Sequence, residues 1–228
     1  FETPFASLST QKSMPDHQDL FLNAARRSIV LLKNDGALPL VSQASPGKEH
    51  ITVVKTNPQA TDAGKVAHDV AQRLQETLLA TVEVVRYAEH AQLGRVSANS
   101  GTIVLLCDGE KEQIDPCLIP QIARDSSRRV LVVLANPRAR ILPSLVNRSN
   151  AVLAAWNLGK HAAEAIADVL VGKVNPGGKL PISIPRSAGQ LPVQYNAKPS
   201  ARRGYLFDSA EPLFSFGWGL SYAAIELG

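Results

Sequence analysis

The sequence predicts an α/β protein, a three-layer α/β/α sandwich around an open, mostly parallel sheet in a flavodoxin-like arrangement. Short apolar runs alternate with longer segments of helical periodicity along the 228 residues. These runs lack apolar–polar alternation, which is typical of strands that are covered on both faces. Strands that alternate with helices favour a parallel sheet with helices on both faces.

The first forty residues predict an extended arm, a helix and a strand. Residues 1–15 contain Pro, Ser and Thr with isolated aromatic residues, and we expect them to form an arm that enters from an upstream domain. The predicted helix covers residues 16–27, with one face formed by Leu20, Phe21, Ala24 and Ala25. Residues 28–33 predict a strand, which the turn signal Asn34-Asp35-Gly36 ends.

The next segments repeat this pattern. Residues 50–56 predict a strand, and residues 59–79 predict a long amphipathic helix. The apolar positions of this helix are Ala63, Val66, Ala67, Val70, Ala71, Leu74 and Leu78. Residues 82–86 predict a short strand, and residues 88–98 fit either a helix or a loop.

The second half of the chain predicts three further apolar strands, at residues 102–107, 130–135 and 151–156. Residues 120–124 predict a short helix or turn, and residues 138–146 predict a short helix.

A helix follows the last strand after the break at Asn157-Leu158-Gly159. Its apolar residues recur at helical spacing at Ala162, Ala165, Ile166, Val169 and Leu170. Gly172 is of the usual type for the end of a helix, and Asn175-Pro176-Gly177-Gly178 predicts a turn.

Composition and charge exclude several classes of protein. The chain is 45% hydrophobic and 19% charged, as in an ordinary soluble globular protein. Its net charge of +4 is scattered, without the basic stripe that binding to nucleic acid requires. No apolar run reaches the roughly 18 residues of a membrane span. The histidines lack the spacing of zinc ligands, and we expect no metal and no cofactor. We expect Cys107 and Cys117 to be free thiols, and a disulfide between them stays open.

Two segments resemble a known family in the order and spacing of their residues. Near the start, residues 25–40 read ARRSIVLLKNDGALPL. Near the end, the matching residues are Ala155-Trp156, Gly159, 165–170, Gly172, 175–181, Leu191-Pro192, Tyr195-Asn196, Tyr205 and 212–222. Together they resemble the C-terminal domain of glycoside hydrolase family 3, the β-glucosidase and β-xylosidase family. The resemblance implies an α/β sandwich over residues 16–222, which follows a (β/α)₈ barrel domain, with residues 223–228 as a C-terminal edge.

The resemblance implies the chemistry of a retaining β-glycosidase that hydrolyses terminal β-linked sugars. Such enzymes use two carboxyl groups about 5–5.5 Å apart, one as the nucleophile and one as the general acid/base. In this family the nucleophile is an aspartate of the barrel, which is not part of this sequence. We therefore expect the chain to be inactive alone and to work with a barrel domain on the same or a separate chain. We favour a periplasmic or secreted location over a cytoplasmic one.

The general acid/base can be sought at the carboxyl ends of the strands, where open α/β sheets bind ligands. Of the loops there, only the one after residues 102–107 is rich in carboxylates, and in many family members it carries a catalytic glutamate. Glu112 is the best positional candidate and Glu110 the second. This loop is shorter than the family pattern, and no Arg follows Asp115. The alternative is therefore that both glutamates are solvated, that all catalytic groups lie on the barrel, and that the chain is a non-catalytic structural or interaction module.

Other candidate residues favour structural roles. Residues 56–61 contain no glycine where the family has a glycine-rich loop at the sugar subsite, so substrate-binding residues stay unassigned. Trp156 and Trp218 could stack on sugars, but packing in the core or at a domain interface is favoured. His161 lacks an accompanying nucleophile motif, and Asp168 fits a helix surface or interface. A free-standing nucleotide binder would need a phosphate loop before a helix, whereas Gly177-Gly178 follows one.

Overall fold

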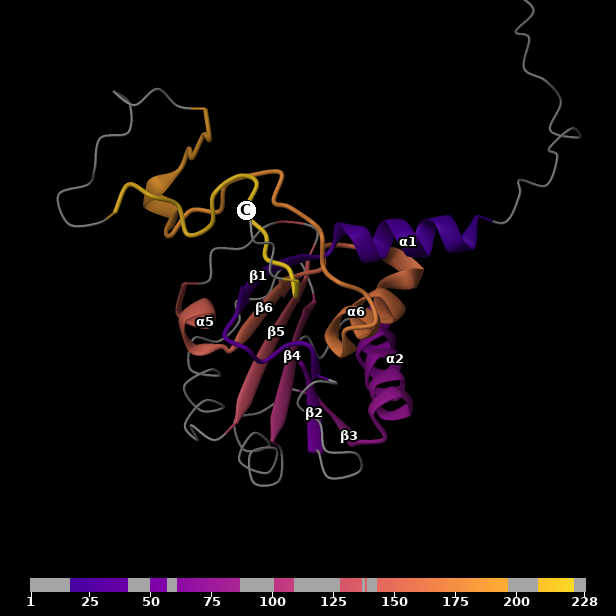
Figure 1. Ribbon diagram of the computed structural model, residues 1–228. Helices are drawn as coiled ribbons and strands as arrows, with labels where there is room; N and C mark the ends of the chain where they lie inside the picture. The colour runs from indigo at the N-terminus through magenta and orange to yellow at the C-terminus, as the bar shows by residue number, and fades with distance from the viewer. Residues whose placement is uncertain are drawn as a thin grey trace, which may run out of the picture.

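The computed structural model describes residues 17–40, 50–56, 61–86, 101–108, 128–136, 138, 143–196 and 209–223. Its centre is a six-stranded sheet of order β1-β6-β5-β4-β2-β3 (Figure 1). The strands are β1 (Val30–Asn34), β2 (His50–Lys55), β3 (Thr81–Arg86), β4 (Thr102–Asp108), β5 (Arg129–Ala135) and β6 (Ala151–Ala154). Strands β2 to β6 run parallel to one another, whereas β1 pairs antiparallel with β6. Without β1, the order is that of the flavodoxin-like doubly wound sheet, which confirms the predicted fold class.

The described helices are α1 (Gln18–Ser28), α2 (Thr61–Leu78), α5 (Pro143–Arg148) and α6 (Ala162–Val171), with 3₁₀ turns at Gly159–His161 and Ala188–Gln190. Helices α2 and α6 pack against each other over one face of the sheet, and α5 lies on the other face (Figure 1). Helix α1 packs on α6 at one end of the molecule. Residues 88–98 and 120–124, for which helices or loops were predicted, lie outside the described residues.

The predicted boundaries are wrong at two places. The last strand ends at Ala154 rather than at Trp156, because Trp156 adopts a positive φ of 50° that an extended strand does not allow. The helix predicted from residue 138 begins only at Pro143, and Arg138 lies in a bend. Proline suits the first position of a helix, since its missing N–H would have no partner there.

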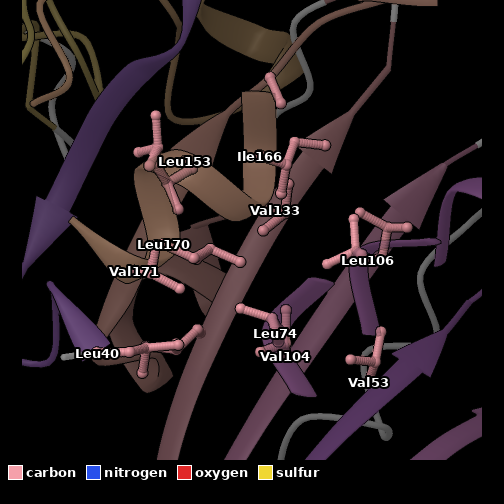
Figure 2. Close-up of a cluster of buried hydrophobic side chains, with 14 of the residues drawn as sticks. Leu40, Val53, Leu74, Val104, Leu106, Val133, Leu153, Ile166, Leu170 and Val171 are labelled. Atoms are coloured by element: carbon pink, nitrogen blue, oxygen red, sulfur yellow. The ribbon is translucent and has the colours of Figure 1, made fainter. Parts of the chain in front are cut away.

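The sheet separates two apolar layers. One layer lies between the sheet and α2 and α6, where Leu74, Val104, Val133, Ile166 and Leu170 interdigitate (Figure 2). The other layer lies beneath α5 and the C-terminal segment, and it includes Ile103, Val132, Leu145, Leu180 and Phe214. Strands β4 and β5 contribute to both layers, which explains their continuous apolar runs. Each fully buried Leu or Ile side chain stabilises the fold by about 1.5–3 kcal/mol.

The open edge of β1 is covered by a segment that we call the strap, residues 173–196 and 209–222. Leu220 forms an antiparallel bridge with Leu31, and its amide donates to the Leu31 carbonyl at 2.8 Å. The Gly178 amide donates to the Ile29 carbonyl at 3.2 Å. These bonds occupy backbone groups that an exposed edge strand would offer to another chain.

Two glycines allow the strap to lie this close to β1. A Cβ atom on Gly178 would lie 2.4 Å from the Ile29 carbonyl oxygen, and one on Gly219 would lie 2.4 Å from the carbonyl oxygen of Gly178. Side chains are excluded at both positions by backbone atoms. Gly177, by contrast, has open space around it, so the turn signal at residues 175–178 contains glycines with two different roles.

Candidate functional site

The carboxyl ends of the parallel strands meet at one edge of the sheet. Leu106 of β4 pairs with Lys55 of β2, and Asp108 pairs with Ala135 of β5. The chain runs from β2 outward to β3 and then returns to β4 on the other side of β2. The strand order therefore reverses between β2 and β4, and open α/β sheets bind ligands outside the carboxyl ends of the strands at such a switch point.

Polar residues are buried at this switch point. Lys55 ends β2 and Thr56 follows it, and both are almost inaccessible to solvent, as is Asn136 after β5. The backbone N–H and the Oγ1 hydroxyl of Thr56 both donate to the Leu106 carbonyl at 3.3 Å. These bonds fix the start of the β2 loop against β4. A buried ammonium group is costly unless it is paired, so Lys55 marks a polar environment at this edge.

The loops at this edge can be expected from the sequence, whereas the roles of Lys55, Thr56 and Asn136 were not predicted. A signal was nonetheless present in the sequence. Each of these residues lies at the last position of a strand or just after it, and both strands are mostly buried and apolar. A polar residue at that position of a parallel strand lies at the ligand-binding edge of the sheet.

The predicted acid/base residues belong to the loop that leaves β4 at this switch point. Asp108 is the last residue of β4, and Glu110 and Glu112 lie outside the described residues. Cys117 also lies outside them, whereas Cys107 is buried in β4. The topology thus places Asp108, from which the acidic loop leaves, between the carboxyl ends of β2 and β5.

Both tryptophans use their indole N–H within the domain. The Trp156 Nε1–H donates to the Ser28 carbonyl at 3.1 Å, and the Trp218 Nε1–H donates to the Leu32 carbonyl at 2.9 Å. Trp218 also packs at an angle on Phe214, with ring centroids 6.0 Å apart. These contacts agree with packing roles at the β1 edge, although Trp218 is 42% exposed.

Asp168 and His161 lie on the face of the domain where α1 meets α6. Asp168 is buried and accepts a 2.7 Å bond from the Arg26 Nε–H of α1. Glu164 bridges Arg26 at 3.4 Å and Arg73 of α2 at 3.1 Å. Asp168 therefore joins two helices, as its predicted interface role requires. The buried Nε2 of His161 has no hydrogen-bond partner among the residues described.

No metal-binding cluster and no spanning helix occur in the part of the chain that the structure describes. Within it, His, Cys, Asp and Glu side chains form no group of three that could hold a metal ion. None of the helices described there has the length and apolar character needed to cross a bilayer.

Comparison with known proteins agrees with this architecture. Residues 29–222 match the sequence model of the family described as "Glycosyl hydrolase family 3 C-terminal domain". The chain is 41% identical over 127 residues to a periplasmic β-glucosidase of Salmonella typhimurium, and 40% identical over 107 residues to a β-xylosidase of Formosa agariphila. These matches cover 48% and 45% of this chain but only 17% and 15% of the two relatives.

Solved structures give the same result over more of the chain. A mutant β-glucosidase of Listeria innocua, in complex with laminaribiose, superimposes with a TM-score of 0.75 at 27% identity. This match covers 94% of the present chain and 35% of the Listeria enzyme. A β-glucosidase of Erythrobacter marinus matches with a TM-score of 0.74 at 25% identity, over 92% of this chain and 36% of the other. The chain thus belongs to glycoside hydrolase family 3, in which it corresponds to the C-terminal α/β domain.

Proposed function

We propose that the chain is the C-terminal domain of a retaining β-glycosidase of the β-glucosidase or β-xylosidase type. In this proposal, residues 16–222 form the domain and residues 1–15 lead into it from a barrel domain. The substrate is a carbohydrate with a terminal β-linked sugar. The observation that carries the proposal is the acidic loop, which starts from the switch point of a domain of this family.

The proposed mechanism divides two carboxyl groups between two domains. An aspartate of the barrel attacks the anomeric carbon, and the bond from that carbon to the leaving oxygen breaks. Glu112, with Glu110 as the second candidate, donates its proton to the leaving oxygen. The resulting carboxylate then removes a proton from water, and the water oxygen displaces the aspartate from the sugar. Thr56 supports this step by holding the end of β2 against β4, the strand that precedes the acidic loop.

A non-catalytic structural module is the second candidate function. The observation in its favour is that the described residues of the family resemblance mostly bond to other residues of the same domain. The Asn175 side chain pairs with Ser221, and Tyr222 donates its hydroxyl to the Val169 carbonyl. In this alternative, the barrel supplies both carboxyl groups, and the domain only braces it.

Point variants in the complete enzyme separate the two candidates. We expect Glu112→Ala to reduce turnover of an unactivated disaccharide by about 10²–10⁴-fold, with a smaller loss for aryl glycosides whose leaving groups need no proton. Added azide should restore part of the rate by intercepting the glycosyl intermediate. Glu110→Ala is the matched control in the same loop. Near-normal hydrolysis of the disaccharide by Glu112→Ala would move the acid to the barrel.

The isolated chain gives an independent test. We expect the 228-residue chain to fold and to leave aryl β-glycosides intact, because one of the two required carboxyl groups is missing. Turnover by the pure chain that a point mutation within it abolishes would contradict the proposed division of groups.

A further inference from the structure

The end of helix α5 carries a sequence motif that the proposed function does not use. Asn147-Arg148-Ser149 is the only Asn-X-Ser/Thr tripeptide in the sequence, and its middle residue is not proline. In this motif the Asn side chain can accept an N-linked oligosaccharide, and the residue two positions later must carry a hydroxyl group. An attached glycan is bulky and hydrophilic, so a used acceptor lies at the protein surface. The surroundings of Asn147 and Ser149 therefore decide whether the motif can be used.

Asn147 lies on the outward face of α5. Leu145 and Val146 are buried and pack in the apolar layer between this helix and the sheet. Asn147 is exposed, as are Ser144 and Arg148. Residues three positions apart are neighbours on a helix surface, so Ser144 and Asn147 share the solvent side of α5. A glycan on Asn147 would consequently extend into solvent without displacing a core residue.

Asn147 also lies away from the candidate site. Asn150, three residues later, donates its amide to the Val130 carbonyl at 2.8 Å and accepts from the Val130 amide through its Oδ1 atom at 2.8 Å. Val130 is the second residue of β5, so this turn lies at the amino ends of the parallel strands. The switch point lies at their carboxyl ends. A glycan on Asn147 would therefore leave the switch point open.

Ser149, which completes the motif, is held inside the folded domain. It is 3% exposed, and its hydroxyl donates to the Val146 carbonyl at 3.2 Å. The Lys33 ammonium donates to the Val146 and Ser149 carbonyls at 3.0 and 2.7 Å, which fixes the turn against β1. A transferase that must recognise the Ser149 hydroxyl cannot reach it until the end of α5 opens. Opening of this kind is a minor state of a folded domain, whereas the newly made chain is open throughout.

We propose that Asn147 is the acceptor of one N-linked oligosaccharide and that it receives the glycan before the end of α5 folds. The reaction takes place where the chain meets an oligosaccharyltransferase and a lipid-linked oligosaccharide diphosphate. The Nδ2 atom of Asn147 forms a bond with the anomeric carbon of the oligosaccharide, and the bond from that carbon to the diphosphate oxygen breaks. The lipid diphosphate leaves, and the amide proton passes to a base of the transferase. This modification does not depend on the glycosidase reaction, so either proposal can fail alone.

Expression through a eukaryotic secretory pathway tests the acceptor. The 228-residue chain is placed behind a signal peptide, and its mass in the whole-cell extract is compared before and after digestion with an amidase that removes N-linked glycans. We expect one glycan on the parent and on Ser149→Thr, which keeps the hydroxyl, and none on Asn147→Gln or Ser149→Ala. Whole-cell extracts score each variant whether or not it folds. A parent without a glycan, or a glycan that persists in Asn147→Gln, would overturn the proposal.

A purified oligosaccharyltransferase with a lipid-linked oligosaccharide tests the order of modification and folding. Its two acceptors are the unglycosylated complete enzyme and a peptide of residues 143–151, and mass spectrometry measures the occupancy of Asn147 in each. We expect the peptide to be modified at least about tenfold faster, because only the folded enzyme must open before Ser149 is reached. Equal rates would refute the requirement for opening. A peptide that stays unmodified would refute Asn147 as an acceptor.

Discussion

The substitution Gly178→Ala should destabilise the domain by detaching the strap from β1. The added Cβ would lie 2.4 Å from the Ile29 oxygen and 2.8 Å from the Ile29 carbon. Ordinary contact begins at 3.4 Å, so the two backbones must separate by about 1 Å, the difference 3.4 − 2.4 Å. Overpacking of this kind costs about 1–3 kcal/mol, and loss of the Gly178–Ile29 hydrogen bond adds about 1 kcal/mol. We therefore expect Gly178→Ala to lower the free energy of unfolding by about 2–4 kcal/mol.

The neighbouring Gly177→Ala is a matched control, because it adds the same methyl group one residue away into open space. Its effect should stay within about 0.5 kcal/mol of zero, or be slightly stabilising through the unfolded chain. The free energy of unfolding of both variants can be measured by urea denaturation of the 228-residue chain. Tryptophan fluorescence reports the transition, since Trp218 is part of the strap. For a chain of this size, the expected loss in Gly178→Ala corresponds to a fall in Tm of roughly 5–15 °C. Equal stability of the two variants would refute the close-approach argument.

Two further predictions concern polar groups of the same domain. Asp168→Asn should lower the free energy of unfolding by about 2–4 kcal/mol, because it removes the more buried of the two carboxylates that pair with the part-buried Arg26. Glu164→Gln, at the more exposed carboxylate, should cost about 1 kcal/mol or less in the same urea assay. Similar losses in the two would contradict a buried ion pair. Burial raises the pKa of the Tyr222 phenol, so the folded chain keeps a proton that the unfolded chain releases above about pH 10. The contribution of Tyr222 to the free energy of unfolding is therefore full below that pH and decreases as the pH rises. The stability difference between the parent and Tyr222→Phe should consequently shrink from about pH 9 to about pH 11, and a constant difference in parallel urea titrations would argue against it.

Most of the sheet could be predicted from the sequence because burial on both faces leaves a local signature. Strands β2, β4 and β5 lie within one residue of the predicted apolar runs, since a polar or turn residue follows each run almost directly. Helix α2 was predictable for a related reason. One of its faces packs on the sheet and α6, so its apolar residues recur at helical spacing.

The direction of β1 and the structure of the strap could not be predicted in this way. An antiparallel edge strand has the same composition as a parallel one, and β1 runs antiparallel because α1 precedes it at the carboxyl end of β6. The strap has no periodicity because its bonds join distant residues, such as Trp218 to Leu32, 186 positions apart. The different roles of Gly177 and Gly178 likewise depend on Ile29, which approaches only in the folded chain.

The location of the candidate site could be predicted from the sequence, but the buried polar residues that line it could not. The rule for open α/β sheets pointed to the loops after β2, β4, β5 and β6, and the topology confirms that these ends share one edge. Among these loops, only the content of carboxylates distinguishes one from another in the sequence, and this points to Glu110 and Glu112. The burial of Lys55 and Asn136 follows from neighbouring strands that are distant in sequence.

The residues that identify the family mainly form hydrogen bonds within the domain. They are therefore evidence for family membership but not for a catalytic role. The Asn175 side chain accepts from the Tyr222 amide at 2.8 Å, and the Lys179 ammonium donates to the Gly219 carbonyl, so the segments around residues 175–181 and 212–222 complete each other's hydrogen bonds. Lys33, in the first matching segment, donates to the Val146 and Ser149 carbonyls at the end of α5. Groups engaged in this way brace the sheet and are not available to a substrate. We therefore expect any catalytic contribution of the domain to come from the loops at the carboxyl ends of the strands.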